Sequence, residues 1–190
     1  MVTKEGLKIL LLLTLLLPLG ILNKAILFAI LFLIVFTLIF FRDPERTIED
    51  GIVSPADGKI DYLSSKRLEI FMSLLDCHVQ RSPVSGIVKK IEHVPGKKYP
   101  AFLRRENERK ILKIETDDGT FAVELISGIF ARRIFCWVRE GERVEKGQKI
   151  GMIAFGSRVA LEIPEGFRFT KNLGEKVKAG ERVAVRDEGR

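Results

Sequence analysis

The chain has 190 residues, with 32 Lys and Arg against 25 Asp and Glu, a formal net charge of +7. This length suits one domain with an appendage. The sequence contains neither the aromatic and basic stripe of a nucleic-acid-binding protein nor a Gly-rich phosphate loop, which argues against nucleic-acid and dinucleotide partners. The two cysteines, Cys77 and Cys136, fit a reducing cytosol better than a disulfide framework.

Two apolar runs dominate the N-terminal part, at 9–22 and 25–41, separated by Asn23 and Lys24. A membrane span needs about 20 apolar residues, so the second run nearly suffices and the first is short. Pro18 and Gly20 interrupt the first run. The pattern predicts an α-helical membrane hairpin, as two short spans or as a re-entrant hairpin. A cleaved signal peptide is disfavoured, because no small-residue cleavage site follows.

Basic residues flank this hairpin on both sides, with Lys4 and Lys8 before it and Arg42 and Arg46 after it. Positive flanks at both ends place both ends on the cytoplasmic side. We therefore expect residues 1–46 to form the membrane hairpin and interfacial linker. Residues 47–190 are expected to form a separate domain on the cytoplasmic face of the cell membrane, with its positive charge towards anionic head groups.

The second part of the chain has a β pattern. Short apolar segments are separated by Gly, Pro and Asp, which is typical of strands joined by tight turns. The expected strands are 52–53, 59–62, 69–72, 86–94, 110–115, 121–126, 134–137, 149–154, 158–163 and 182–185.

One weak internal repeat refines this prediction. Residues 141–150 echo residues 174–183 with the pattern G-E-x-V-x-x-G-x-x-[IV]. Such a turn-and-strand unit is typical of lipoyl- and biotinyl-like barrels, where Gly forms the turn and Val or Ile fixes the next strand in the core. The predicted fold is mainly β, a lipoyl/biotinyl-like barrel-sandwich with an N-terminal helical hairpin. This fold does not by itself indicate a function.

Few residues can carry chemistry. His78 and His93 are the only histidines and so the obvious general bases, although His93 is expected at the surface. Asp57 precedes a glycine, a pair that commonly forms a plain hairpin turn. Gly156 and Ser157 could likewise form a turn, or a site where a serine attacks the preceding carbonyl. No metal-binding motif occurs, so no metal is expected.

Six motifs in fixed order resemble the short, membrane-tethered form of phosphatidylserine decarboxylase, including its archaetidylserine relatives. The resemblance covers nearly the whole chain. Any one motif is weak, but the ordered set is specific. The motifs are Phe-Phe-Arg-Asp-Pro at 40–44, Ser-Pro-Ala-Asp-Gly at 54–58, Asp-Cys-His-Val-Gln-Arg-Ser-Pro at 76–83, Glu-Asn-Glu-Arg at 106–109, Ala-Arg-Arg-Ile at 131–134 and Phe-Gly-Ser at 155–157.

The resemblance implies a proenzyme that cuts itself between Gly156 and Ser157. Ser157 would act as the nucleophile and become a pyruvoyl group, the electron sink that decarboxylation requires, without pyridoxal phosphate or metal. A β chain of residues 1–156 and an α chain of residues 157–190 would stay together as a heterodimer, with a higher homo-oligomer left open. The substrate would be phosphatidylserine or archaetidylserine in the membrane, and the product the ethanolamine phospholipid.

The same resemblance assigns roles to single residues. In the longer family members two histidines, three positions apart, follow the motif's aspartate. The first matches His78, which would be the acid/base of the decarboxylation step; the second position is Arg81. That second histidine belongs to an Asp-His-Ser self-cleavage triad, of which Asp57 and Ser157 match the other members. Asp57 would then act directly or through water, with His93 as a substitute base.

Three arginines are candidates for substrate binding. Arg81, Arg132 and Arg133 could bind the phosphodiester or carboxylate, since a guanidinium matches both groups; surface charge near the membrane is the alternative. The competing function is a membrane-tethered lipoyl-like barrel adaptor without catalysis. The absence of a Met-Lys-Met modification site argues against a lipoyl or biotin carrier, and the ordered motifs argue against an adaptor.

Overall fold

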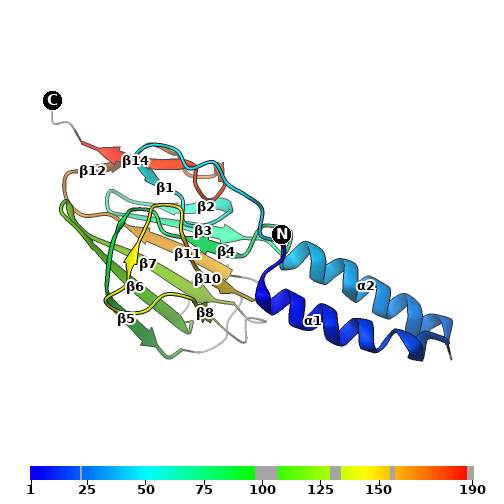
Figure 1. The fold of residues 1–190 in the computed structure, drawn as a ribbon. Helices are drawn as coiled ribbons and strands as arrows, with labels where there is room; N and C mark the ends of the chain where they lie inside the picture. The colour runs from blue at the N-terminus through cyan, green and yellow to red at the C-terminus, as the bar shows by residue number, and fades with distance from the viewer. Residues whose placement is uncertain (22, 97–106, 129–133, 155–156, 188–190) are drawn as a thin grey trace. The chain divides into compact units, whose positions relative to one another are not determined.

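The computed structural model describes residues 1–21, 23–96, 107–128, 134–154 and 157–187 (Figure 1). The chain divides into two compact units, Met1–Glu45 and Arg46–Arg190.

The first unit is helical. It contains α1 (Lys4–Leu15), the short 3-10 helix η1 (Leu17–Ile21) and α2 (Lys24–Phe40). The Asn23 side chain caps α2 by accepting a hydrogen bond from the Ala25 amide at 2.8 Å. Pro18 and Gly20 lie in η1, where α1 has already ended. A Cβ at Gly20 would lie 2.8 Å from the Cβ of Leu27, so the glycine permits η1 to approach α2 closely.

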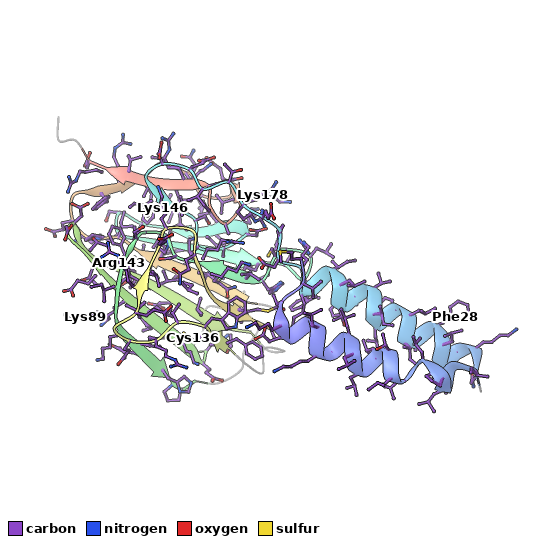
Figure 2. The ribbon with its side chains drawn as sticks, viewed as in Figure 1. Phe28, Lys89, Cys136, Arg143, Lys146 and Lys178 are labelled. Carbon is purple, nitrogen blue, oxygen red and sulfur yellow. The ribbon has the colours of Figure 1, made fainter. Side chains whose placement is uncertain are left out.

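Large apolar side chains cover much of the surface of this unit. Phe28, drawn in Figure 2, is 71% exposed. Others that are more than half exposed are Met1, Leu7, Leu11, Leu12, Leu15, Ile21, Phe32 and Val35. Within the described residues, no helix is both long enough and apolar enough to cross a membrane.

The second unit is built from strands, so the prediction of a mainly β fold is confirmed. All ten predicted strands occur; the pattern missed β4, β9, β12 and β13, which have two or three residues each. The strands are β1 (Ile52–Val53), β2 (Gly58–Leu63), β3 (Arg67–Met72), β4 (Val79–Arg81), β5 (Gly86–Val94), β6 (Arg109–Thr116), β7 (Gly119–Ser127), β8 (Ile134–Cys136), β9 (Arg143–Val144), β10 (Lys149–Ile153), β11 (Ser157–Glu162), β12 (Phe167–Phe169), β13 (Lys176–Val177) and β14 (Arg182–Arg186).

These strands form a curled sheet of eight strands and two sheets of three. The large sheet has the order β13-β2-β3-β11-β7-β6-β5-β9, and the small sheets have the orders β4-β10-β8 and β1-β14-β12. Strand β11 lies inside the large sheet, antiparallel to β3 on one side and to β7 on the other. The chain segment predicted to start at the cleavage site is therefore held by two neighbouring strands.

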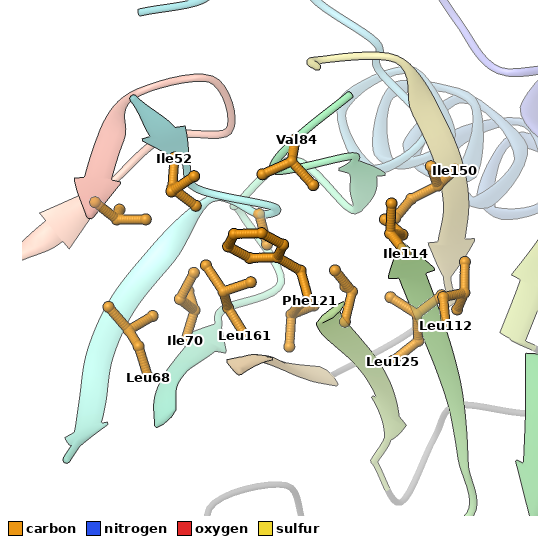
Figure 3. Packing of buried hydrophobic residues seen from close by; sticks show 14 of the residues in the cluster. Ile52, Leu68, Ile70, Val84, Leu112, Ile114, Phe121, Leu125, Ile150 and Leu161 are labelled. Carbon is orange, nitrogen blue, oxygen red and sulfur yellow. The ribbon is translucent and has the colours of Figure 1, made fainter. Parts of the chain in front are cut away.

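One apolar core joins all three sheets. Its members alternate along the strands of the large sheet, as in β3, where Leu68 and Ile70 are fully buried. Figure 3 shows these residues near Leu161 of β11 and Phe121 of β7. Burying each side chain of this size contributes about 1.5–3 kcal/mol. Packing of this kind fixes β11 between its neighbours.

The internal repeat occupies the two edges of the large sheet. Its first copy supplies β9, which pairs with β5, and its second copy supplies β13, which pairs with β2. The turns that follow need Gly147 and Gly180, which have φ angles of 82° and 97°. A Cβ at Gly147 would lie 2.4 Å from a side-chain atom of Ile48. Both copies therefore use glycine for a left-handed turn and for close approach.

Candidate active site

Ser157 is the first residue of β11, one position earlier than the sequence predicts for this strand. Its backbone lies opposite Met72 of β3 and opposite Ser127 of β7. Gly156 lies outside the described residues. Of the two residues that the predicted scissile bond joins, the structure therefore describes Ser157, which two strands hold in the interior of the sheet.

His78 lies just before β4 and is completely buried. Its Nδ1 is 2.9 Å from the backbone oxygen of Asp76. Because a carbonyl oxygen only accepts hydrogen bonds, this contact places the proton of the neutral ring on Nδ1. Nε2 is then the nitrogen that can accept a proton and return it, as an acid/base must.

A short chain of contacts connects His78 with the strand that carries Ser157. Gln80, fully buried in β4, donates from Nε2 to the backbone oxygen of His78 at 2.7 Å. The same Nε2 lies 3.7 Å from the sulfur of Met72, the residue opposite Ser157. The structure therefore brings the segment of His78 and the start of β11 into one region, although 79 positions separate them in the sequence.

Asp57 lies in the turn before β2 and is 7% exposed. Its Oδ2 is 2.5 Å from Nη2 of Arg46, and its Oδ1 accepts from the Ala179 amide at 2.9 Å. The same ion pair influences the thiol of Cys77, the residue before His78. Burial raises the pKa of this thiol, the negative charge of Asp57 raises it further, and Arg46 lowers it. Asp57 and His78 therefore lie in the same region.

The other predicted residues differ in their placement. Arg81, in β4, is 9% exposed and donates from Nη1 to the Gly147 backbone oxygen at 3.0 Å. A guanidinium has no acceptor, so position 81 cannot take over the role of a proton-accepting histidine. Arg132 and Arg133 lie outside the described residues.

Among the described residues, no group of three His, Cys, Asp or Glu side chains is placed to hold a metal ion.

His93 is distant from β11. It lies in β5, opposite Lys110 of β6, which is opposite Leu125 of β7, which in turn is opposite Val159. Three strand spacings correspond to about 14 Å. The side chain is half exposed, and its Nε2 lies 3.0 Å from Oε1 of Glu108. His93 is at the surface of the sheet, as expected from the sequence.

An ionic network follows directly after Ser157. Arg158 is 2% exposed, and its Nη1 lies 2.7 Å from both Asp61 and Glu69. Arg67 extends the network to Glu69 and to Glu124 of β7. Burial opposes the charge of Arg67, but the hydrogen bonds that its guanidinium donates to Glu124 and Glu69 outweigh this effect and raise its pKa. The first residues of β11 are thereby tied to three other strands.

Sequence reasoning missed two buried polar groups beside Ser157. Within the described part of the chain, neither the Oγ of Ser127 nor the Oε1 of Gln80 has a hydrogen-bond partner. Ser127 lies directly opposite Ser157, and Gln80 contacts Met72, which lies opposite it on the other side. Ser127 belongs to no motif that indicates chemistry, and Gln80 lies within the motif at 76–83 without a role assigned to it. The proximity of both residues to Ser157 arises only from strand pairing.

Comparison with known proteins identifies the class of this site. A family model described as phosphatidylserine decarboxylase matches residues 33–185. A putative archaetidylserine decarboxylase proenzyme of Archaeoglobus fulgidus is 60% identical over 150 residues, covering 78% of this chain and 77% of that protein. A phosphatidylserine decarboxylase proenzyme of Streptomyces coelicolor is 44% identical over 149 residues, covering 74% and 68%.

These matches define an enzyme of the carboxy-lyase class. The chain belongs to the phosphatidylserine decarboxylase family. The resemblance drawn from the six motifs is thereby confirmed, and the alternative of an adaptor without catalysis is disfavoured.

Proposed function

We propose that this protein is made as one chain, cuts itself between Gly156 and Ser157, and then converts a serine phospholipid into the ethanolamine phospholipid and carbon dioxide. The observation that carries the proposal is the position of Ser157. It opens a central strand and lies beside the segment that holds the buried His78. The lipid is phosphatidylserine or archaetidylserine, the two substrates in the names of the relatives.

Self-cleavage follows from ordinary acyl chemistry. The Oγ of Ser157 adds to the carbonyl carbon of Gly156, the carbon–nitrogen bond breaks, and the proton of the hydroxyl ends on the freed nitrogen. The resulting ester loses the Cα proton of residue 157, and the Cβ–Oγ bond breaks to release Gly156 as a carboxylate. The unsaturated residue rearranges to an imine, and water adds to the imine carbon and releases ammonia, which leaves a ketone, the pyruvoyl group.

The fold supports a chain that is cut at this point. Residues 157–190 contain β11 to β14, of which β11 pairs with β3 and β7, β13 with β2 and β14 with β1 of the other product. The two products are therefore expected to remain a heterodimer after the peptide bond is lost. The Arg158 ion pairs with Asp61 and Glu69 hold the new chain end in addition.

The surroundings of Ser157 suit a pyruvoyl group. The group is small and uncharged, and its carbonyl oxygens need polar neighbours. Ser127, the residue opposite position 157, has a buried hydroxyl that can be such a neighbour. When formed, the ketone supplies the electron sink that loss of a carboxylate requires. His78 is proposed to hold and deliver a proton at Nε2 during decarboxylation, with its ring oriented by the Asp76 carbonyl.

Asp57 is proposed as a positioning residue for self-cleavage. Both of its carboxylate oxygens accept hydrogen bonds, from Arg46 and from the Ala179 amide. Because this ion pair influences the thiol of Cys77, Asp57 is proposed to hold the Cys77–His78 segment in place. Action on Ser157, directly or through water, is the alternative. Substrate binding is proposed for Arg81, Arg132 and Arg133, because guanidinium groups match the phosphodiester and the carboxylate of the lipid.

Residues 1–46 are proposed to attach the enzyme to the cell membrane, with the catalytic unit on the cytoplasmic face. The support is the exposed apolar surface of α1 and α2 and the basic residues at both ends of this segment. Helix α2 has 17 residues, a length of about 25 Å. A re-entrant insertion would confine the enzyme to the plane of a substrate that cannot leave the bilayer.

A lipid assay tests the proposed reaction. The purified full chain is mixed with vesicles that contain either ester-linked phosphatidylserine or ether-linked archaetidylserine, and the product lipids are analysed. The expected result is the ethanolamine lipid from at least one of the two. A Ser157→Ala variant should remain uncut and inactive, and turnover by that variant would refute the proposed cofactor.

A further inference from the structure

Ser127, the last residue of β7, is 1% exposed. Within the described part of the chain its Oγ neither donates nor accepts a hydrogen bond. An unsatisfied buried hydroxyl is destabilising, and native proteins rarely keep one without a use. Both backbone groups of Ser127, in contrast, form hydrogen bonds. The amide donates to the backbone oxygen of Glu108 at 2.9 Å, and the carbonyl accepts from Nδ2 of Asn107 at 2.7 Å.

These backbone contacts define how Ser127 faces Ser157. Glu108 and Asn107 directly precede β6, so both backbone groups of Ser127 are directed to the β6 side of its strand. Ser127 and Ser157 therefore form a non-hydrogen-bonded pair of the antiparallel ladder, in which the Cα atoms are about 4.5 Å apart. The predicted scissile bond ends at the nitrogen of Ser157, one covalent bond from that Cα.

We propose that Ser127 is a catalytic residue of self-cleavage. Its hydroxyl donates a hydrogen bond to the oxygen that becomes negatively charged when the Oγ of Ser157 adds to the Gly156 carbonyl carbon. In this step one carbon–oxygen bond forms and the carbonyl π electrons move onto the oxygen. When the carbon–nitrogen bond breaks, the electrons return and the Ser157 hydroxyl proton ends on nitrogen. The inference rests on the proposed function.

Burial makes such a donor effective. A prearranged hydrogen-bond donor in a site without water stabilises a developing oxyanion far more than one in solvent, and removing one typically slows acyl transfer about 100-fold or more. A donor that is needed only while the oxyanion exists has no partner in the resting chain, which agrees with the Oγ of Ser127.

The test compares self-cleavage rates of the full chain, and thermal unfolding midpoints of the same variants in the Ser157→Ala background, which keeps every chain uncut. Ser127→Ala should cleave about 100-fold more slowly. Its unfolding midpoint should not fall, because the variant removes an unsatisfied buried group. Ser127→Thr retains a hydroxyl and should cleave at a rate within several-fold of the wild type. Ser64→Ala is the control, because Ser64 caps the turn at the other end of β3 through Arg67.

The outcomes separate this inference from the proposed function. A Ser127→Ala chain that cuts itself at the wild-type rate would overturn the role of Ser127 and leave self-cleavage intact. Slower cleavage together with a lower unfolding midpoint, or loss of folding, would assign the hydroxyl to packing and also overturn it. A wild-type chain that remains uncut would overturn the proposed function, and this inference with it.

Discussion

Arg158 offers a quantitative test of how β11, the strand at the proposed new chain end, is held. Its guanidinium is 3% exposed and contacts Asp61 at 2.6 Å and Glu69 at 2.7 Å. Replacing Arg158 with Met retains the apolar stem and removes the charge, so two carboxylates lose their shared partner. Folding free energy is lost mainly because both carboxylates stay partly buried without the charge of Arg158, although Glu69 keeps its ion pair with Arg67.

The expected size follows from that geometry. Breaking a buried ion pair by removing one partner costs about 3–5 kcal/mol. Asp61 is 27% exposed and can regain water, so the lower end, about 3 kcal/mol, applies. For a protein of this size, 1 kcal/mol corresponds to about 2–4 °C in the unfolding midpoint. Arg158→Met should therefore lower the midpoint by about 6–12 °C.

The assay is thermal unfolding in the Ser157→Ala background, which keeps the chain uncut so that cleavage does not affect the midpoint. Arg168→Met is the matched control, because Arg168 is 61% exposed and lies 3.6 Å from Asp187. An exposed pair of this kind contributes about 0–1 kcal/mol, so the control should hardly move. If the two variants unfold within a degree or so of each other, the ion pairs do not hold β11 in the way described.

Three further predictions concern His78, acid stability and the thiols. His78→Ala should still cut itself yet lose decarboxylation; an uncut His78→Ala chain would show that His78 acts in the earlier step. Burial opposes the charge of Glu69, but Arg67 and Arg158 outweigh it and lower its pKa. The stability that the charged Glu69 contributes is therefore present above the ordinary glutamate pKa of 4.5, and it is lost as the pH falls through the lower pKa of the folded state. Glu69→Gln should accordingly weaken the pH dependence of unfolding in acid. An acid unfolding profile identical to that of the wild type would contradict this role of Glu69. Burial raises the pKa of Cys77, so a thiol reagent should label Cys136 first at neutral pH, and preferential labelling of Cys77 would contradict its burial.

The strands were predictable where their pattern is local. In β3, buried Leu68 and Ile70 alternate with half-buried neighbours, and this period of two is visible in the sequence. Strands β4 and β12 have three residues each, too few for any period, and exist because β10 and β14 pair with them. Short strands of this kind depend on tertiary partners and leave almost no local signal.

The site was predictable only in part for the same reason. Ser157 and His78 were indicated by ordered motifs, and Asp57 by its match to a triad. The partner of Asp57 is Arg46, a residue that the sequence suggested only as part of a membrane flank. The position of Ser127 beside Ser157 depends on the register of β7 against β11. Such pairings are set by the fold and do not appear in any contiguous motif.

The most direct test of the account is the intact mass of the purified full chain. Self-cleavage predicts two masses, for residues 1–156 and 157–190, with the smaller chain lighter by one ammonia than a peptide that begins with Ser157. That chain should also resist Edman degradation, because a pyruvoyl group has no free amine. A single uncut chain with full decarboxylase activity, or a small chain with a free serine amine, would contradict the central claim.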